Sequence, residues 1–158
     1  MTDAEFHEAY AQHKDVLYRF ARRLTGSGLA AEDLVHDCFL ILWRSGTKYD
    51  SQRATLRSFL IGVTRNLAWK RLRKERAFDE LEDEMIVSDP IDPAGRERSE
   101  MVEQAVAALP PLQREALILA EYEGMTLEEI TRITGRENLR RMLAPLLDTK
   151  GTAYGTQR

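Results

Sequence analysis

Cysteine is nearly absent from this 158-residue chain, in which Cys38 is the only one. A single thiol excludes an intramolecular disulfide and any zinc site built from several thiolates. It favours a reducing compartment such as the cytoplasm. The three histidines, His7, His13 and His36, lack the spacing of metal ligands, so the sequence predicts no metal site.

Long apolar runs are missing as well. No run approaches the ~20 residues needed to span a bilayer, and the first residues lack the basic and then apolar pattern of a secretory leader. We therefore expect a cytoplasmic protein that is neither secreted nor embedded in a membrane. No nucleophile and base pair, phosphate-binding glycine loop or carboxylate dyad stands out, so the sequence predicts neither an enzyme nor a bound cofactor.

The charges are sorted along the chain, although the formal net charge is only -3. Residues 48–76 carry nine Lys or Arg side chains against two carboxylates. Residues 79–103 carry ten carboxylates against two arginines. A cationic segment is thus followed directly by an acidic one, and the near-neutral average conceals two opposed surfaces.

Apolar residues recur at helical spacing over three segments of the first half. The spacing predicts helices over residues 5–24, 30–44 and 56–76, with Gly26 and Gly28 ending the first and a polar loop over residues 45–55. Cys38 and Trp43 lie on or beside the second apolar stripe, so both are interpreted as core residues. The predicted inward positions are Phe6, Tyr10, Leu17, Phe20, Leu24, Leu34, Val35, Cys38, Ile41, Leu42, Leu56, Phe59, Leu60, Val63 and Leu67.

The second half begins with an acidic segment, residues 78–99, whose prolines and glycine predict a linker. A further apolar region, residues 101–109, precedes a predicted helix over residues 112–123 that Gly124 closes. Thr126 and Glu129 then have the spacing of a capping box, and Gly135 ends the short helix that they start. A helix, a tight turn and a second helix are the outline of a helix-turn-helix. The fold class predicted is all-α, with two small helical domains joined by a flexible linker.

Several segments resemble the extracytoplasmic-function (ECF) group of the sigma-70 family of bacterial RNA polymerase sigma factors. Residues 31–43 (AEDLVHDCFLILW), 48–50 (KYD) and 56–68 (LRSFLIGVTRNLA) are similar to region 2 of that family. Residues 108–116 (ALPPLQREA) and 123–130 (EGMTLEEI) resemble the start of region 4. The resemblance covers most of the chain, and two region 2 segments in the right order make it specific.

The resemblance breaks off after Gly135. Family members continue with a turn and a basic recognition helix, whereas here residues 136–138 lead into 139–143 (LRRML), which is more similar to the tail beyond that helix. The sequence thus predicts a deleted or shortened recognition helix, and Pro145 limits any substitute for it. Arg140 and Arg141 remain as phosphate contacts, which position a protein without reading sequence.

The resemblance implies a domain order and a function. Residues 1–77 would form region 2, residues 78–99 the acidic linker and residues 100–158 a truncated region 4. The chain would bind core RNA polymerase at the clamp coiled-coil of its largest subunit and direct promoter-specific initiation. Promoter DNA and an anti-sigma factor are the further partners that the resemblance implies.

Two sets of candidate site residues follow from the resemblance. The core-polymerase set lies on the segment similar to region 2.2 and comprises Glu32, Asp33, His36, Asp37 and Leu40. The DNA set includes a loop that would capture a flipped promoter base and a helix that would line the adjoining duplex or displaced strand. Its members are Lys48, Tyr49, Asp50, Ser51, Gln52, Arg53, Arg65, Asn66, Trp69, Lys70, Arg73, Lys74, Arg140 and Arg141.

Simpler interpretations stay open beside these. Each charged residue alone also fits a solvated helix face, the cationic helix also suits an acidic membrane or RNA, and Trp69 also fits a core position. The resemblance implies that the acidic linker runs toward the RNA path of the polymerase, where carboxylates could mimic nucleic-acid charge, but the sequence alone favours ordinary disorder. Two other functions remain as hypotheses: a helix-turn-helix regulator that acts without polymerase, and a defective sigma-like protein that titrates polymerase or an anti-sigma factor.

Overall fold

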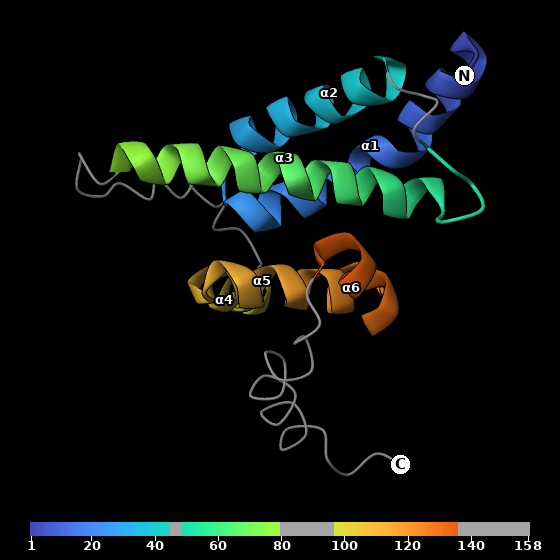
Figure 1. The fold of residues 1–158 in the computed structure, drawn as a ribbon. Helices are drawn as coiled ribbons and strands as arrows, with labels where there is room; N and C mark the ends of the chain where they lie inside the picture. Colours follow the sequence, from blue (N-terminus) through green and yellow to red (C-terminus); the bar gives the residue numbers. More distant parts are fainter. Residues whose placement is uncertain (45–48, 80–96, 136–158) are drawn as a thin grey trace, which may run out of the picture. The chain divides into compact units, whose positions relative to one another are not determined.

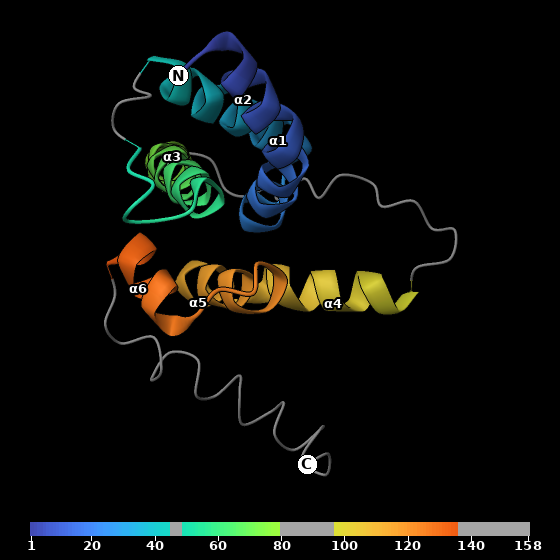
Figure 2. The ribbon, with the colours of Figure 1, turned by 90° about the vertical axis from the view of Figure 1, so that its right-hand side faces the viewer.

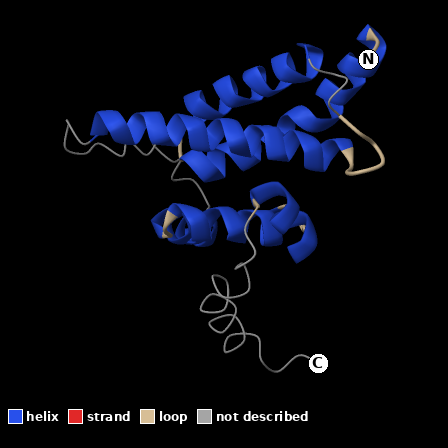
Figure 3. Cartoon of the chain, viewed as in Figure 1, coloured by secondary structure: helices blue, strands red, loops and turns tan. Residues whose placement is uncertain are grey.

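A computed structural model describes residues 1–44, 49–79 and 97–135 (Figure 1). Within these ranges every regular element is a helix and none is a strand, which confirms the all-α prediction (Figure 3). None of the helices in the described ranges has the length and hydropathy of a membrane-spanning segment. Met1–Ala107 and Ala108–Arg158 make up two compact units, each described by itself below. The domain limits inferred from the sequence stay a prediction.

The first helix, α1 (Asp3–Thr25), has a capping motif at each end. Thr2 Oγ1 accepts a hydrogen bond from the Glu5 backbone N–H at 3.2 Å, and the Glu5 carboxylate accepts one from the Thr2 N–H at 2.7 Å. This capping box starts the helix two residues earlier than the apolar spacing predicts. Gly26, with a φ of 73°, ends it, because that left-handed conformation suits glycine. Gly28 does not end α1, as was predicted, but begins α2.

Helices α2 (Gly28–Arg44) and α3 (Leu56–Asp79) complete a three-helix unit with α1, and the three lie side by side (Figures 1 and 2). Near the start of α1, the ring of Phe6 lies 4.9 Å from that of Trp43, at the end of α2. Further along α1, the rings of Tyr10 and Phe39 are also 4.9 Å apart. Because residue numbers rise on α1 as they fall on α2, the two helices are antiparallel.

Helices α2 and α3 are antiparallel by the same reasoning. The Cys38 thiol donates to the Leu60 carbonyl at 3.6 Å, whereas Asp33, earlier on α2, contacts Arg71, later on α3. Cys38 is fully buried, in agreement with its interpretation as a core residue. Burial raises the pKa of its thiol to about 11, and the neighbouring Thr64 hydroxyl opposes that rise.

The buried face of α3 differs from the one predicted. Of the expected stripe only Leu60 is buried, whereas Leu56, Phe59, Val63 and Leu67 are half-buried. Between residues 56 and 75 of this helix, where side-chain burial is described, the fully buried positions are Leu60, Ile61, Thr64 and Ala68. Two neighbouring rows of side chains on α3 are apolar enough to be buried. The row that faces α1 and α2 includes small side chains, which let packed helices approach closely. Apolar spacing alone could not choose between them.

Two aromatic residues are more exposed than predicted. Trp43 is 52% exposed and Tyr10 is 43% exposed, so the interpretation of both as core residues is wrong. Trp43 lies in the last turn of α2, where the edge-to-face contact with Phe6 covers part of the ring. The ends of α1 and α2 therefore present aromatic surface to solvent.

Helices extend into both ends of the segment, residues 78–99, that the composition predicts as a linker. Helix α3 continues to Asp79, and α4 (Glu97–Ala108) begins before the predicted boundary at residue 100. Residues 80–96 lie outside the described part of the chain. On α4, Met101 is 70% exposed and Val102 is 53% exposed, whereas Val106 is buried. The apolar region predicted over residues 101–109 is thus helical but largely open at its start.

The predicted helix over residues 112–123 is divided in two. Helix α5 (Pro111–Leu117) continues into a π-helical turn, η2 (Ile118–Tyr122), in which the Glu123 N–H donates to the Ile118 carbonyl at 3.1 Å. In a π turn the donor residue comes five positions after the acceptor residue, one more than in an α-helix, and the helix is locally wider. Ile118 and Leu119 are both fully buried in it. Gly124, with a φ of 63°, closes the turn as predicted.

Helix α6 (Leu127–Thr134) completes the described part of the second unit. Thr126 Oγ1 accepts a hydrogen bond from the Glu129 N–H at 3.2 Å, so Thr126 caps the helix as predicted. The Glu129 carboxylate accepts from the Thr126 hydroxyl at 3.4 Å, in place of the backbone N–H that the predicted capping box would use. Ile130 is fully buried and Ile133 is half-buried. Gly135, with a φ of 67°, ends the helix. The prediction of a shortened recognition helix, with Arg140 and Arg141, falls on residues 136–158 and lies outside the described residues.

Candidate protein and nucleic-acid interface

The five candidates for polymerase binding share one side of α2. Glu32, His36 and Leu40 are four residues apart, and Asp33 and Asp37 form the adjacent row, so all five are neighbours on the helix surface. The four polar side chains are exposed and Leu40 is half-buried. The structure thus brings this predicted set together as an acidic surface with one apolar member.

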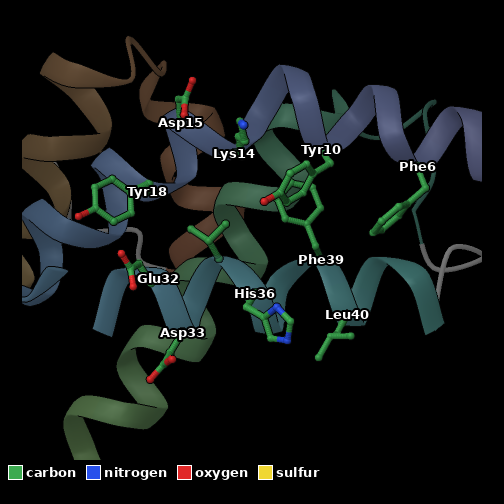
Figure 4. Close-up of a pocket in the computed structure, with 11 residues that line it drawn as sticks. Phe6, Tyr10, Lys14, Asp15, Tyr18, Glu32, Asp33, His36, Phe39 and Leu40 are labelled. Carbon is green, nitrogen blue, oxygen red and sulfur yellow. The ribbon is translucent and has the colours of Figure 1, made fainter. Parts of the chain in front are cut away.

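A groove of about 720 Å³ runs between α1 and α2 beside this surface (Figure 4). Figure 4 shows the rings of Tyr10 and Phe39 close together between the helices, where they meet edge to face with 64° between their planes. Asp37 is the one member of the predicted set that does not line the groove. The lining residues are Phe6, Tyr10, Lys14, Asp15, Tyr18, Glu32, Asp33, Val35, His36, Phe39 and Leu40.

The contribution of α1 to this groove was not predicted. Lys14 Nζ lies 5.5 Å from the centre of the Tyr10 ring, a cation–π distance. Asp15, Glu32 and Asp33 outnumber Lys14, so the groove is acidic as well as aromatic. The available signal was the mixture of aromatic and charged residues in the first turns of α1, which a purely buried helix face would not carry.

Arg71 of α3, a residue in neither predicted set, contacts the polymerase candidate Asp33 on α2. The Arg71 guanidinium donates to the Asp33 carboxylate at 3.2 Å and to the Glu75 carboxylate at 3.2 Å. Arg71 therefore turns toward α2 instead of joining the solvent-facing cations of α3. Sequence spacing offers no signal for a contact between residues 38 positions apart.

The described part of the candidate base-capture loop has internal order. The Tyr49 ring lies 5.3 Å from the Phe59 ring at a tilt of 51°. Asp50 accepts a hydrogen bond from the Gln52 backbone N–H at 2.9 Å and forms an ion pair with Arg53 at 3.6 Å. Ser51, Gln52 and Arg53 are exposed. Lys48, the first residue of the predicted loop, lies outside the described residues.

The predicted DNA-binding residues of α3 form two groups. Asn66, Lys70, Arg73 and Lys74 are exposed, and their spacing places them along one side of the helix. Arg65 and Trp69 form a second group, in which the Arg65 guanidinium lies 5.7 Å from the Trp69 ring centre and donates to the Asn66 side chain at 3.1 Å. Trp69 is half-buried.

The candidate polymerase surface on α2 and the candidate DNA surface on the loop and α3 both lie in a segment that matches a known protein family. Residues 9–78 match the family of sigma-70 region 2, and residues 99–137 match sigma-70 region 4. The first match includes α2, the described loop and almost all of α3, and the second ends two residues beyond Gly135. The chain belongs to the sigma-70 family of RNA polymerase sigma factors, and within it to the ECF group.

Individual relatives bear the same family name. The chain is 32% identical over 136 residues to the ECF RNA polymerase sigma factor SigE of Mycolicibacterium smegmatis, an alignment that spans 81% of this chain but 52% of SigE. It is 27% identical over 139 residues to the ECF sigma factor SigK of Mycobacterium tuberculosis, covering 82% of this chain and 73% of SigK. It is 28% identical over 134 residues to the RNA polymerase sigma factor CarQ of Myxococcus xanthus, covering 82% and 76%. The chain thus spans about half the length of SigE.

A solved structure shares the fold. The sigma factor RpoE, crystallised in complex with the anti-sigma factor NepR from Bartonella quintana, matches with a TM-score of 0.79. The match covers 98% of this chain and 99% of that chain at 23% sequence identity. It supports the all-α sigma-factor fold of the chain.

Proposed function

We propose that this protein is an ECF-type sigma factor that binds core RNA polymerase and directs promoter-specific transcription initiation in the cytoplasm. The observation that carries the proposal is the match to sigma region 2 across a three-helix unit that presents an acidic helix face beside an exposed cationic one. The chain would supply recognition, and polymerase would supply the chemistry.

The polymerase would bind at α2 and the groove beside it. Glu32, Asp33, His36 and Asp37 offer polar contacts, and Leu40 with the aromatic groove offers apolar area. Interfaces gain affinity from buried aromatic groups and specificity from complementary charge. A clamp coiled-coil with basic side chains beside an apolar stripe would complement this surface.

Promoter DNA would bind at the loop and at the exposed side of α3. Cations neutralise phosphates, and a polar loop with an aromatic neighbour can hold a base outside the stack. Residues 51–53 and the row from Asn66 to Lys74 are the exposed groups in position for these tasks. An anti-sigma factor is a further proposed partner, because RpoE was crystallised with one.

Reconstitution tests the proposal. The full chain is added to core RNA polymerase and a library of DNA templates randomised upstream of the start site, and the transcripts are sequenced. We expect enrichment of one promoter sequence over the background of core polymerase alone. Background initiation alone would overturn the proposal.

The rival functions predict other results. A regulator independent of polymerase would bind duplex DNA but would not retain polymerase subunits in a pull-down. A sigma-like protein that only titrates polymerase would retain those subunits and yield no enriched promoter.

A further inference from the structure

The turn over residues 50–54 is organised by the Asp50 side chain together with its backbone carbonyl. One carboxylate oxygen of Asp50 accepts the Gln52 N–H at 2.9 Å, and the other lies 3.6 Å from Arg53 Nε. The Asp50 carbonyl accepts the N–H groups of Arg53 at 3.1 Å and Ala54 at 3.4 Å. Aspartate commonly holds such turns by bonding the backbone two residues ahead.

The flanks of the turn are anchored to α3. On one side, the Tyr49 ring packs on Phe59, which is half-buried. On the other, Thr55 Oγ1 accepts the Ser58 N–H at 3.2 Å, and the Thr55 carbonyl accepts the Phe59 N–H at 3.0 Å. The segment between these anchors carries the exposed residues 51–53 at its tip.

We propose that Asp50 and Phe59 are positioning residues of the DNA-binding loop and that Asp50 does not itself contact a base. This inference rests on the proposed function. Both carboxylate oxygens of Asp50 already have partners within the loop, and a free carboxylate facing a nucleic acid would be repelled by its phosphates. A loop ordered before binding loses less conformational entropy when it captures a base.

Phe59 is assigned a positioning role because its ring contacts the Tyr49 ring. Its ring supports one side of Tyr49 and thereby limits where the Tyr49 ring can lie. Offset and tilted aromatic pairs are favourable beyond their buried area. Phe59 would therefore act on DNA through Tyr49, without touching it.

Two substitutions at Asp50 distinguish a role in positioning the loop from a direct contact with a DNA base. Asp50→Asn keeps an oxygen that accepts the Gln52 N–H, whereas Asp50→Ala removes it. With holoenzyme made from the full chain and the randomised template library, Asp50→Ala should lower specific transcripts about fivefold to tenfold, the loss expected of one or two hydrogen bonds. Asp50→Asn should stay within about twofold of the unchanged protein, because one of those bonds is kept. Both variants should keep the promoter sequence preferred by the unchanged protein.

The opposite pattern overturns the inference. A loss with Asp50→Asn as large as with Asp50→Ala, or a changed base preference at one promoter position in either variant, would show a direct contact. Asp3→Ala, which removes an exposed carboxylate in the first turn of α1, serves as the matched control. Amide exchange provides a structural readout: the Gln52 N–H should exchange faster in Asp50→Ala and unchanged in Asp50→Asn. If the Gln52 N–H exchanged at the same rate in the unchanged protein, Asp50→Ala and Asp50→Asn, the inference would also be overturned.

Phe59→Leu tests the second residue with less risk to folding than Phe59→Ala. It should lower specific transcripts, leave retention of polymerase subunits unchanged and shift the fluorescence or exchange signals of Tyr49. Unchanged transcripts would remove Phe59 from the inference. If the unchanged protein directs no specific transcripts, the proposed function itself fails, a result distinct from any difference among the variants.

Discussion

Arg71 donates a hydrogen bond to Asp33 across 3.2 Å, and this pair joins the helix of the proposed polymerase surface to the helix of the proposed DNA surface. Their side chains are 35% and 67% exposed, so water screens the pair. The contact nevertheless has a geometric consequence. It turns one cation of α3 toward α2, whereas Lys70, Arg73 and Lys74, among the α3 side chains that the structure describes, are exposed to solvent.

Breaking this pair should have a small effect on stability. Exposed ion pairs contribute about 0.2–1 kcal/mol, so Arg71→Gln should lower the free energy of unfolding by less than about 1 kcal/mol. Urea denaturation of Arg71→Gln, Asp33→Asn and the double variant would measure the coupling between the two residues. The coupling should shrink in high salt. A salt-independent coupling well above that range would contradict this account.

Cys38 should be unreactive in the folded chain. Burial raises the pKa of its thiol from the ordinary 9.0 to about 11, and the thiolate is the form that reacts. Alkylation by iodoacetamide at pH 9 should therefore be much slower in the folded protein than in urea. Equal rates would contradict the burial of Cys38.

The same pKa shift predicts a pH dependence of stability. Between about pH 9 and 11 the unfolded thiol loses its proton while the folded thiol keeps it, so the folded state binds more protons. The contribution of Cys38 to the free energy of unfolding therefore falls as the pH rises from about 9 to about 11. Cys38→Ala should remove this share of the pH dependence, which denaturation curves at several pH values would measure.

Reversing a charge on α2 should weaken polymerase binding. Glu32→Lys places a cation on an exposed acidic surface, and we expect core polymerase to bind about tenfold more weakly. The matched control is Glu8→Lys, an exposed glutamate on α1 that does not line the groove. Equal affinities of the two variants, measured with labelled protein and core polymerase, would place the docking surface elsewhere.

The exposed cations of α3 should set the salt dependence of DNA binding. Each phosphate contact contributes about 0.7–0.9 to the slope of log affinity against log salt. Lys70→Gln with Lys74→Gln should therefore lower the slope measured for the holoenzyme by about 1.4–1.8. Arg19→Gln, which removes an exposed cation from α1, should leave the slope unchanged. An unchanged slope in the double variant would exclude both lysines as phosphate contacts.

Gly26 should be sensitive to the kind of side chain that replaces it. Its φ of 73° is strained for most residues, and asparagine tolerates this conformation better than alanine. We expect Gly26→Ala to lower the free energy of unfolding by about 1 kcal/mol and Gly26→Asn by less. Urea denaturation of both variants would measure the difference, and an equal loss would contradict the backbone explanation.

Periodicity and capping residues were sufficient to predict most helix positions. The first three helices were placed within a few residues, because apolar spacing and terminal glycines are local features. The family could also be recognised from the sequence, because the segment from Ala31 to Trp43 that carries the resemblance is continuous. The π turn after Leu117 was not predicted, because no local residue pattern distinguishes it from a regular helical turn.

Only part of each candidate site could be predicted from the sequence. Spacing placed Glu32, Asp33, His36 and Asp37 together, because four-residue steps bring side chains to one helix side. It could not reveal that Phe6 and Tyr10 complete a groove beside them, or that Asp50 has its partners within its own turn. Those relations depend on how helices pack and on how a loop folds back.

The amino-acid sequence by itself determined the helical elements, the sorting of charge and the membership of the sigma-70 family, because each is encoded in short, continuous segments. Only the tertiary structure decided which stripe of α3 is buried, that Trp43 is exposed and that Arg71 reaches Asp33. Helical spacing defines the residues that share a side but not the rotation of that side toward its neighbours. Packing selects the rotation, because it must fit the small side chains of one helix against the bulk of the others.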